Sequence, residues 1–125
     1  MTENELSFVA RGAIFTVFKT LGPGLLESVY ESALTEELIR RRVGVRRQVP
    51  IPVYYGETTL DVGFRLDLLL DDKVIIEIKS VDSLTSVHHK QIITYLRLSG
   101  IKLGLLVNFN TTDVSKTIFR KVNGL

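Results

Sequence analysis

The stretch Val74-Ile75-Ile76-Glu77-Ile78-Lys79-Ser80 decides the fold. Its run of β-branched residues predicts a buried strand. Side chains two positions apart in a strand lie on one face, so Glu77 and Lys79 point the same way. Ile76 and Ile78 point the other way. Charged groups in an apolar run cost free energy unless something compensates them, and a metal ion or a phosphate would do so.

The composition is that of an ordinary globular protein. The 125 residues are 45% hydrophobic and 24% charged, which fits a single domain over residues 1–125. The absence of cysteine excludes disulfides, thiolate zinc sites and cysteine nucleophiles. No apolar run reaches about 18 residues. The acidic N-terminus lacks a signal-peptide pattern, so we expect a cytoplasmic protein that does not enter a membrane.

Two helices are predicted in the first third of the chain. A capping-box pattern from Thr2 to Glu5 begins a helix over residues 3–20, and the second runs from residue 25 to about residue 42. Arginines near its end suit the negative end of the helix dipole, or they extend a phosphate-binding surface. Both interpretations remain open, and the second makes Arg46 and Arg47 substrate contacts. The arginines are Arg40, Arg41, Arg42, Arg46 and Arg47.

Strands and one further helix are predicted in the rest of the chain. Residues 45–55 contain Pro50 and Pro52, which suit an edge strand. Residues 58–70 form a long strand, and a turn at 71–73 leads into the strand quoted above. A helix over residues 84–99 connects that strand to a buried strand over 102–109, and such a helix is the usual crossover between parallel strands. Residues 114–122 fit either a strand or a helix.

The predicted fold class is therefore α/β, in the order α-α-β-β-β-α-β-(β). It has a mixed sheet with an antiparallel hairpin, one βαβ crossover and flanking helices.

The hairpin register predicts a pair of acids. A three-residue turn at 71–73 sets Asp67 opposite Glu77, and Arg65 opposite Lys79. Two carboxylates with Cβ atoms about 5 Å apart repel each other unless a cation lies between them. A two-residue turn would instead direct Asp67 to the other face, so the shared site depends on the turn length.

Hard oxygen ligands favour Mg²⁺ or Mn²⁺ over zinc at such a site. Lys79 could then orient or activate a water molecule, or contact a phosphate, and Glu27 could complete the site from the second helix. The predicted reaction is metal-assisted hydrolysis of a phosphodiester bond.

Asp67, followed after nine residues by Glu77-x-Lys79, resembles the PD-(D/E)XK nuclease motif, although Leu66 replaces its proline. The resemblance implies a restriction-endonuclease-like fold and a metal-dependent nuclease. It implies metal ligands at Asp67, Glu77 and Glu27, and at Ile78 between the two residues of the E-x-K pair. Five residues match the catalytic positions of that superfamily in order: Glu27, Asp67, Glu77, Lys79 and Gln91.

More narrowly, Gly24-Leu25-Leu26-Glu27-Ser28-Val29-Tyr30 fits the pattern of the GxxExxY proteins, a PD-(D/E)XK-like family. This resemblance covers nearly the whole chain. Tyr30 and Arg65 are predicted substrate contacts. His88, Gln91 and Tyr95 fall on one stripe of the third helix and predict a polar wall beside the site.

Structural roles compete with each of these assignments. His88 fits a capping residue, Tyr95 fits a packed core residue, and Glu77 with Lys79 fits an ion pair on an exposed face. Functionally, we expect a nuclease that acts on DNA rather than RNA without reading sequence, with a homodimer by analogy to resolvases. The alternatives are a non-catalytic nucleic-acid- or protein-binding module that keeps the fold, or a subunit whose partner supplies the substrate.

Overall fold

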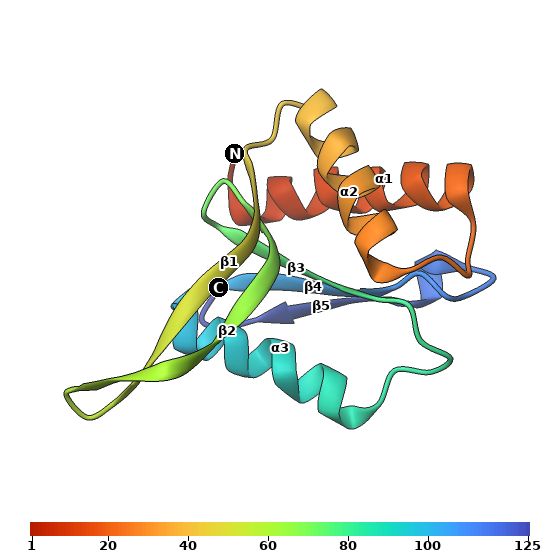
Figure 1. Ribbon diagram of the computed structural model, residues 1–125. Coiled ribbons are helices and arrows are strands. Elements are labelled where there is room, and N and C mark those ends of the chain that lie inside the picture. Colours follow the sequence, from red (N-terminus) through yellow and green to blue (C-terminus); the bar gives the residue numbers. More distant parts are fainter.

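The chain folds into one mixed five-stranded sheet with helices on both faces (Figure 1). The computed structural model describes residues 1–60 and 63–125. The predicted α/β fold class and order of elements are confirmed. The elements are α1 Glu3–Leu21, α2 Glu27–Arg40, β1 Val45–Tyr55, β2 Thr58–Leu70, β3 Val74–Lys79, α3 Ser86–Ser99, β4 Leu103–Asn108, a 3₁₀ turn η1 Val114–Lys116, and β5 Ile118–Val122.

The strands lie in the order β1-β2-β3-β4-β5. β3 and β4 are parallel and joined by α3, which confirms the predicted crossover, and the other neighbours are antiparallel. β1 is an edge strand, as its prolines predicted. The segment at 114–122, left open by the sequence, is the turn η1 followed by the edge strand β5.

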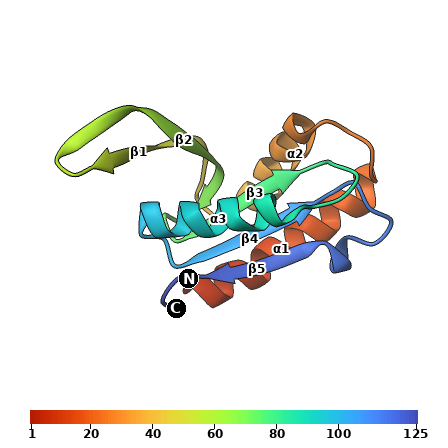
Figure 2. The same ribbon diagram turned by 90° about the horizontal axis from the view of Figure 1, so that it is seen from below.

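α1 and α2 cover one face of the sheet, and α3 covers the other (Figures 1 and 2). The larger apolar core lies under α1 and α2, and the smaller one lies under α3. The outer part of the β1–β2 hairpin extends beyond the helices (Figure 2). None of the helices in the described part of the chain is long and apolar enough to cross a membrane.

Three of the predicted helix ends differ from the observed ones by two residues. α2 begins at Glu27 rather than residue 25 because Leu26 has an extended backbone. It ends at Arg40 because Arg42 takes a left-handed conformation with a φ of 66°. α3 begins at Ser86 because Thr85 caps it.

β3 is the buried strand that its sequence predicts. Residues 74–78 are buried, and Lys79 is half-buried. Ile76 and Ile78 belong to the core under α1 and α2, whereas Ile75 belongs to the core under α3. Glu77 is only 3% exposed, so the alternative of an ion pair on an exposed sheet face is wrong.

Candidate active site

The β2–β3 hairpin has the predicted register. A turn at 71–73 leaves Leu70 opposite Val74, and the pairing continues to Leu68 opposite Ile76, where it stops. The next position in this register holds Asp67 and Glu77. Arg65 was predicted to lie opposite Lys79, and this prediction is wrong. Arg65 pairs with Pro50 of β1, and the pairing between β2 and β3 does not reach it. The acids therefore lie where the pairing between β2 and β3 ends, and this point is the opening between the two strands.

Asp67 and Glu77 are held together by contacts across this opening. The main-chain N–H of Asp67 donates to Glu77 Oε1 at 3.2 Å. The main-chain N–H of Ile78 donates to Asp67 Oδ2 at 2.8 Å. Each carboxylate is thus fixed by the backbone of the opposite strand, because the ladder bonds that would occupy these N–H groups are absent there.

The pair is electrostatically unfavourable without a cation. Burial and the negative charge of Asp67 together raise the pKa of the Glu77 carboxyl to about 9, although Lys79 acts in the opposite direction. The pKa of the Tyr95 hydroxyl is also raised, by burial and then by Glu77 and Asp67. Tyr95 therefore lies within the field of both acids.

Glu27 approaches the same region from the first turn of α2. Its Oε1 atom accepts the main-chain N–H of Ser80 at 3.2 Å, and Ser80 Oγ donates to the carbonyl of Leu25 at 2.7 Å. These contacts tie the start of α2 to the end of β3. A cavity of about 230 Å³ lies between them, lined by Glu27, Ser28, Glu31, Gln48, Asp67 and Ile78.

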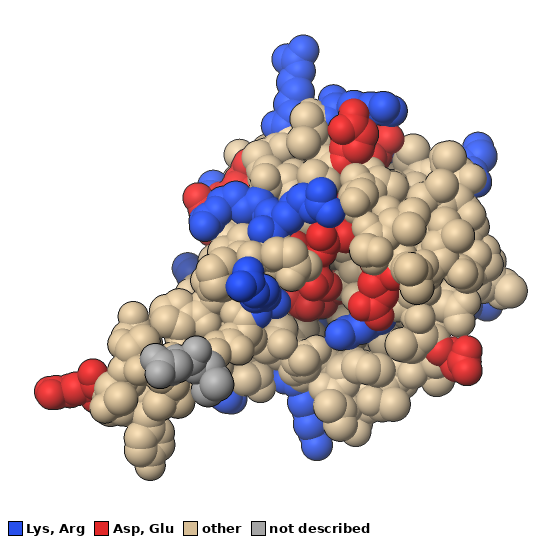
Figure 3. Space-filling model, in the orientation of Figure 1, with Lys and Arg blue, Asp and Glu red and all other residues tan. Residues whose placement is uncertain are grey.

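Figure 3 shows acidic side chains gathered in a hollow at the centre of this face, with lysine and arginine side chains around it. An acidic centre with a basic border suits a cation in the hollow and phosphate groups around it.

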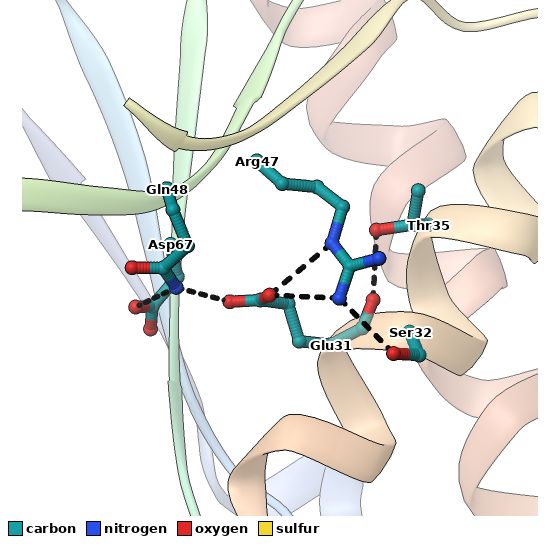
Figure 4. Close-up of polar contacts among 6 residues, drawn as sticks. All are labelled: Glu31, Ser32, Thr35, Arg47, Gln48 and Asp67. Atoms are coloured by element: carbon teal, nitrogen blue, oxygen red, sulfur yellow. Dashed lines mark hydrogen bonds and ion pairs between the residues drawn. The ribbon is translucent and has the colours of Figure 1, made fainter. Parts of the chain in front are cut away.

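Sequence reasoning missed Glu31 and Gln48, which Figure 4 shows beside Asp67. Glu31 is 8% exposed, and its Oε2 atom accepts Nε and one terminal nitrogen of Arg47 at 3.2 and 3.0 Å. Gln48 Nε2 donates to Glu31 Oε1 at 2.5 Å and to Asp67 Oδ1 at 3.4 Å. The four-residue spacing between Glu27 and Glu31 was a usable signal for the acid. The sequence carries no comparable signal for Gln48.

The prediction of Tyr30 as a substrate contact is wrong. Its side chain is fully buried and its ring stacks on Phe109, with the ring centroids 4.3 Å apart. Its hydroxyl donates to the carbonyl of Gly22 at 2.6 Å and accepts the N–H of Leu25. Tyr30 therefore fixes the α1–α2 connection from within the core.

Two further predicted substrate contacts have structural roles. His88 Nδ1 accepts the main-chain N–H of Thr85 at 3.0 Å, which confirms the capping interpretation. Arg46 makes an ion pair with Asp72 at 3.0 Å, beside the 71–73 turn rather than at the acids. Arg47 is near the acids, but it binds Glu31 and Ser32.

Three other predicted site residues, Tyr95, Gln91 and Arg65, lie on α3 and β2. Tyr95 is half-buried and stacks on Phe64, with the ring centroids 4.1 Å apart. Gln91 is half-buried on α3, and Arg65 is exposed on β2. The Ile78 side chain is packed in the core, so only its main chain is available as a metal ligand.

The donor set fits a two-carboxylate site for Mg²⁺ or Mn²⁺. Within residues 1–60 and 63–125, no three aspartate, glutamate or histidine side chains are close enough to hold a metal ion together. Mg²⁺, however, is usually held by one or two protein carboxylates with water and substrate phosphate. Asp67 and Glu77 would provide that pair, and Glu27 Oε1 accepts the main-chain N–H of Ser80 nearby.

Comparisons with known proteins bear on the family and the fold of the chain. None of the curated proteins matches the sequence. The crystal structure of SSO0001 resembles the chain with a TM-score of 0.51 and 17% sequence identity, over 96% of this chain and 78% of that one. At this identity the likeness concerns the fold alone. The family model of the PD-(D/E)XK nuclease superfamily matches residues 4–122, and the chain therefore belongs to that superfamily.

Proposed function

We propose that this protein is a metal-dependent nuclease that hydrolyses phosphodiester bonds, in DNA rather than RNA. Membership of a nuclease superfamily supports this proposal. The observation that carries it is the contact of Asp67 with Glu77 at the opening between β2 and β3, beside Lys79. Two facing carboxylates and an adjacent ammonium suit a divalent cation and a phosphate better than they suit a protein core.

In this proposal, Asp67 and Glu77 hold Mg²⁺ or Mn²⁺. When bound, such an ion stabilises negative charge on phosphate oxygens and lowers the pKa of a water molecule. Lys79 lies two residues after Glu77 on β3, so its ammonium can orient the attacking water or contact the phosphate. Glu27 and Gln91 are proposed to complete the site from α2 and α3.

Cleavage without sequence recognition is supported by the side chains around the hollow. Acidic side chains lie in the hollow, and lysine and arginine side chains lie around it (Figure 3). Lysine and arginine there would contact phosphates, which position a nucleic acid without reading its bases. We extend the proposal to a cytoplasmic protein that acts as a homodimer on branched DNA.

The test is cleavage of single-stranded, duplex and branched DNA and of RNA, with Mg²⁺, Mn²⁺ or EDTA. Wild type is expected to cleave only with metal, and Glu77→Ala and Lys79→Ala should each lose roughly 10²-fold or more of the rate. Lys73→Ala is the matched control. Lys73 immediately precedes the same strand, and its ammonium donates to the carbonyl of Met1.

Equal cleavage by wild type and both variants would identify a contaminating nuclease. Metal-independent binding of DNA without any cleavage would favour a non-catalytic binding module that keeps the fold. Loss of activity in Lys73→Ala as well would indicate general damage to β3. The molecular mass of the protein in solution, measured with and without branched DNA, tests whether it forms a homodimer.

A further inference from the structure

At Gln48, the apolar side chains of the β1–β2 hairpin switch from one face of the sheet to the other. Before this point, Val45 and Leu68 pack with the core under α1 and α2. Beyond it, Val49 and Leu66 pack with the core under α3. Regular strands keep alternate residues on one face, so both strands turn over between these positions.

The backbone of Gln48 makes this change possible. Arg47 pairs with Leu68 and Val49 pairs with Leu66, so Gln48 and Asp67 are opposite each other, but this pair is missing from the ladder. Gln48 has a φ of 50°, a left-handed conformation that is uncommon outside glycine. Such strained residues persist where the surrounding structure fixes them, and they are concentrated at functional sites.

The result is that two consecutive side chains reach the same acid. Arg47 and Gln48 both donate to Glu31, whereas a regular strand would direct them to opposite faces (Figure 4). Glu31 then holds the Gln48 amide in place. The Nε2 group carries two hydrogens, so it can donate to Glu31 and Asp67 at once.

We infer that the left-handed turn at Gln48 serves to direct its amide at Asp67, and that Gln48 is a positioning residue for the carboxylate pair. The inference rests on the proposed metal site. Ile78 holds Asp67 Oδ2 and Gln48 holds Asp67 Oδ1, so the carboxylate is fixed at both oxygens. Each oxygen keeps a lone pair for a cation. As a positioning residue, Gln48 acts through its contact with Asp67.

Gln48→Gly tests this inference because it separates positioning from folding. Glycine adopts positive φ at no steric cost, so the melting temperature in EDTA should stay within about 3 °C of wild type or rise. The affinity for Mn²⁺ alone, measured by calorimetry, should fall about tenfold or more, as for other residues that orient metal ligands. Cleavage should recover at high Mn²⁺ concentration.

Ser32→Ala is the matched control, because Ser32 accepts a hydrogen bond from Arg47 without contacting Asp67. It should leave Mn²⁺ affinity unchanged. The Ile78 amide resonance in metal-free protein gives a second readout, since this N–H donates to Asp67. It should shift in Gln48→Gly and stay in place in Ser32→Ala.

Wild-type Mn²⁺ affinity together with an unshifted Ile78 resonance in Gln48→Gly would overturn the inference and leave the nuclease proposal standing. If wild type binds no Mn²⁺, the proposed metal site fails instead. The Ile78 resonance then still decides whether Gln48 orients Asp67.

Discussion

Glu31 on α2 and Glu77 on β3 are both nearly buried, with 8% and 3% of their surface exposed, but their surroundings are opposite. Glu31 accepts hydrogen bonds from the Arg47 guanidinium and the Gln48 amide. Glu77 accepts a main-chain N–H and faces the carboxylate of Asp67. At Glu31 the carboxylate is matched by donors, whereas at Glu77 the nearby Lys79 does not offset burial and the negative charge of Asp67. The neighbours of a buried acid, more than its burial, therefore separate a structural acid from a candidate ligand.

The strongest test of this comparison is metal binding. In wild type, Mn²⁺ at about 100 times its dissociation constant should raise the free energy of unfolding by about 2.7 kcal/mol. Asp67→Asn should abolish this gain because it removes one of the two ligands. Glu31→Gln should only weaken binding, by roughly tenfold, because Glu31 acts through Gln48. Thermal unfolding against Mn²⁺ concentration measures both. Equal loss in the two variants would erase the distinction between the regions.

The two acids should also respond differently to loss of charge in metal-free protein. The pKa of Glu77 is raised from 4.5 to about 9 in the fold, so the unfolded chain releases this proton at lower pH. The free energy of unfolding therefore falls as pH rises between these values. Glu77→Gln cannot titrate, and near pH 8 it should be more stable than wild type by about 1–3 kcal/mol.

Urea denaturation in EDTA at several pH values between 5 and 8 measures this effect. Glu31→Gln serves as the control and should gain no stability, because it weakens the contact with Arg47. A wild-type pH dependence that persists unchanged in Glu77→Gln would show that Glu77 is not the acid responsible.

Removing the Arg47 guanidinium that pairs with Glu31 should lower the free energy of unfolding. Arg47→Ala leaves Glu31 buried with Gln48 as its remaining side-chain donor. We expect a loss of about 1–2 kcal/mol, less than for a fully buried pair because the Arg47 side chain is 44% exposed. Arg46→Ala is the matched control, because both side chains of the Arg46–Asp72 pair are exposed. It should lower the free energy of unfolding by less than about 0.5 kcal/mol. Chemical denaturation compares them, and equal losses would contradict the assignment of Glu31 as a paired acid.

The smallest expected effect concerns a residue outside both regions. Tyr30→Phe removes a hydroxyl that bonds Gly22 and Leu25, which should lower the free energy of unfolding by about 1 kcal/mol. Metal affinity and cleavage should not change, because the ring is in the core. A change in cleavage at constant stability would restore Tyr30 to the site.

Local patterns predicted that the two acids of the candidate site lie together. The turn at 71–73 sets the β2–β3 register, and that register places Asp67 next to Glu77. The same patterns misassigned Tyr30 and Arg46, because neither a motif position nor a cluster of arginines reveals whether a side chain points into the core or toward a turn. The Arg65 prediction failed because the register was extended past Leu68, where β2 and β3 part.

By itself, the sequence determined the α/β class, the crossover through α3, and the acids on β2 and β3, because turn length and apolar periodicity act over a few neighbouring residues. Only the tertiary structure decided that the hairpin turns over at Gln48 and brings Glu31 to Asp67. Those contacts join α2, β1 and β2 across many residues of chain, and the left-handed φ that permits them is set by packing rather than by the residue type.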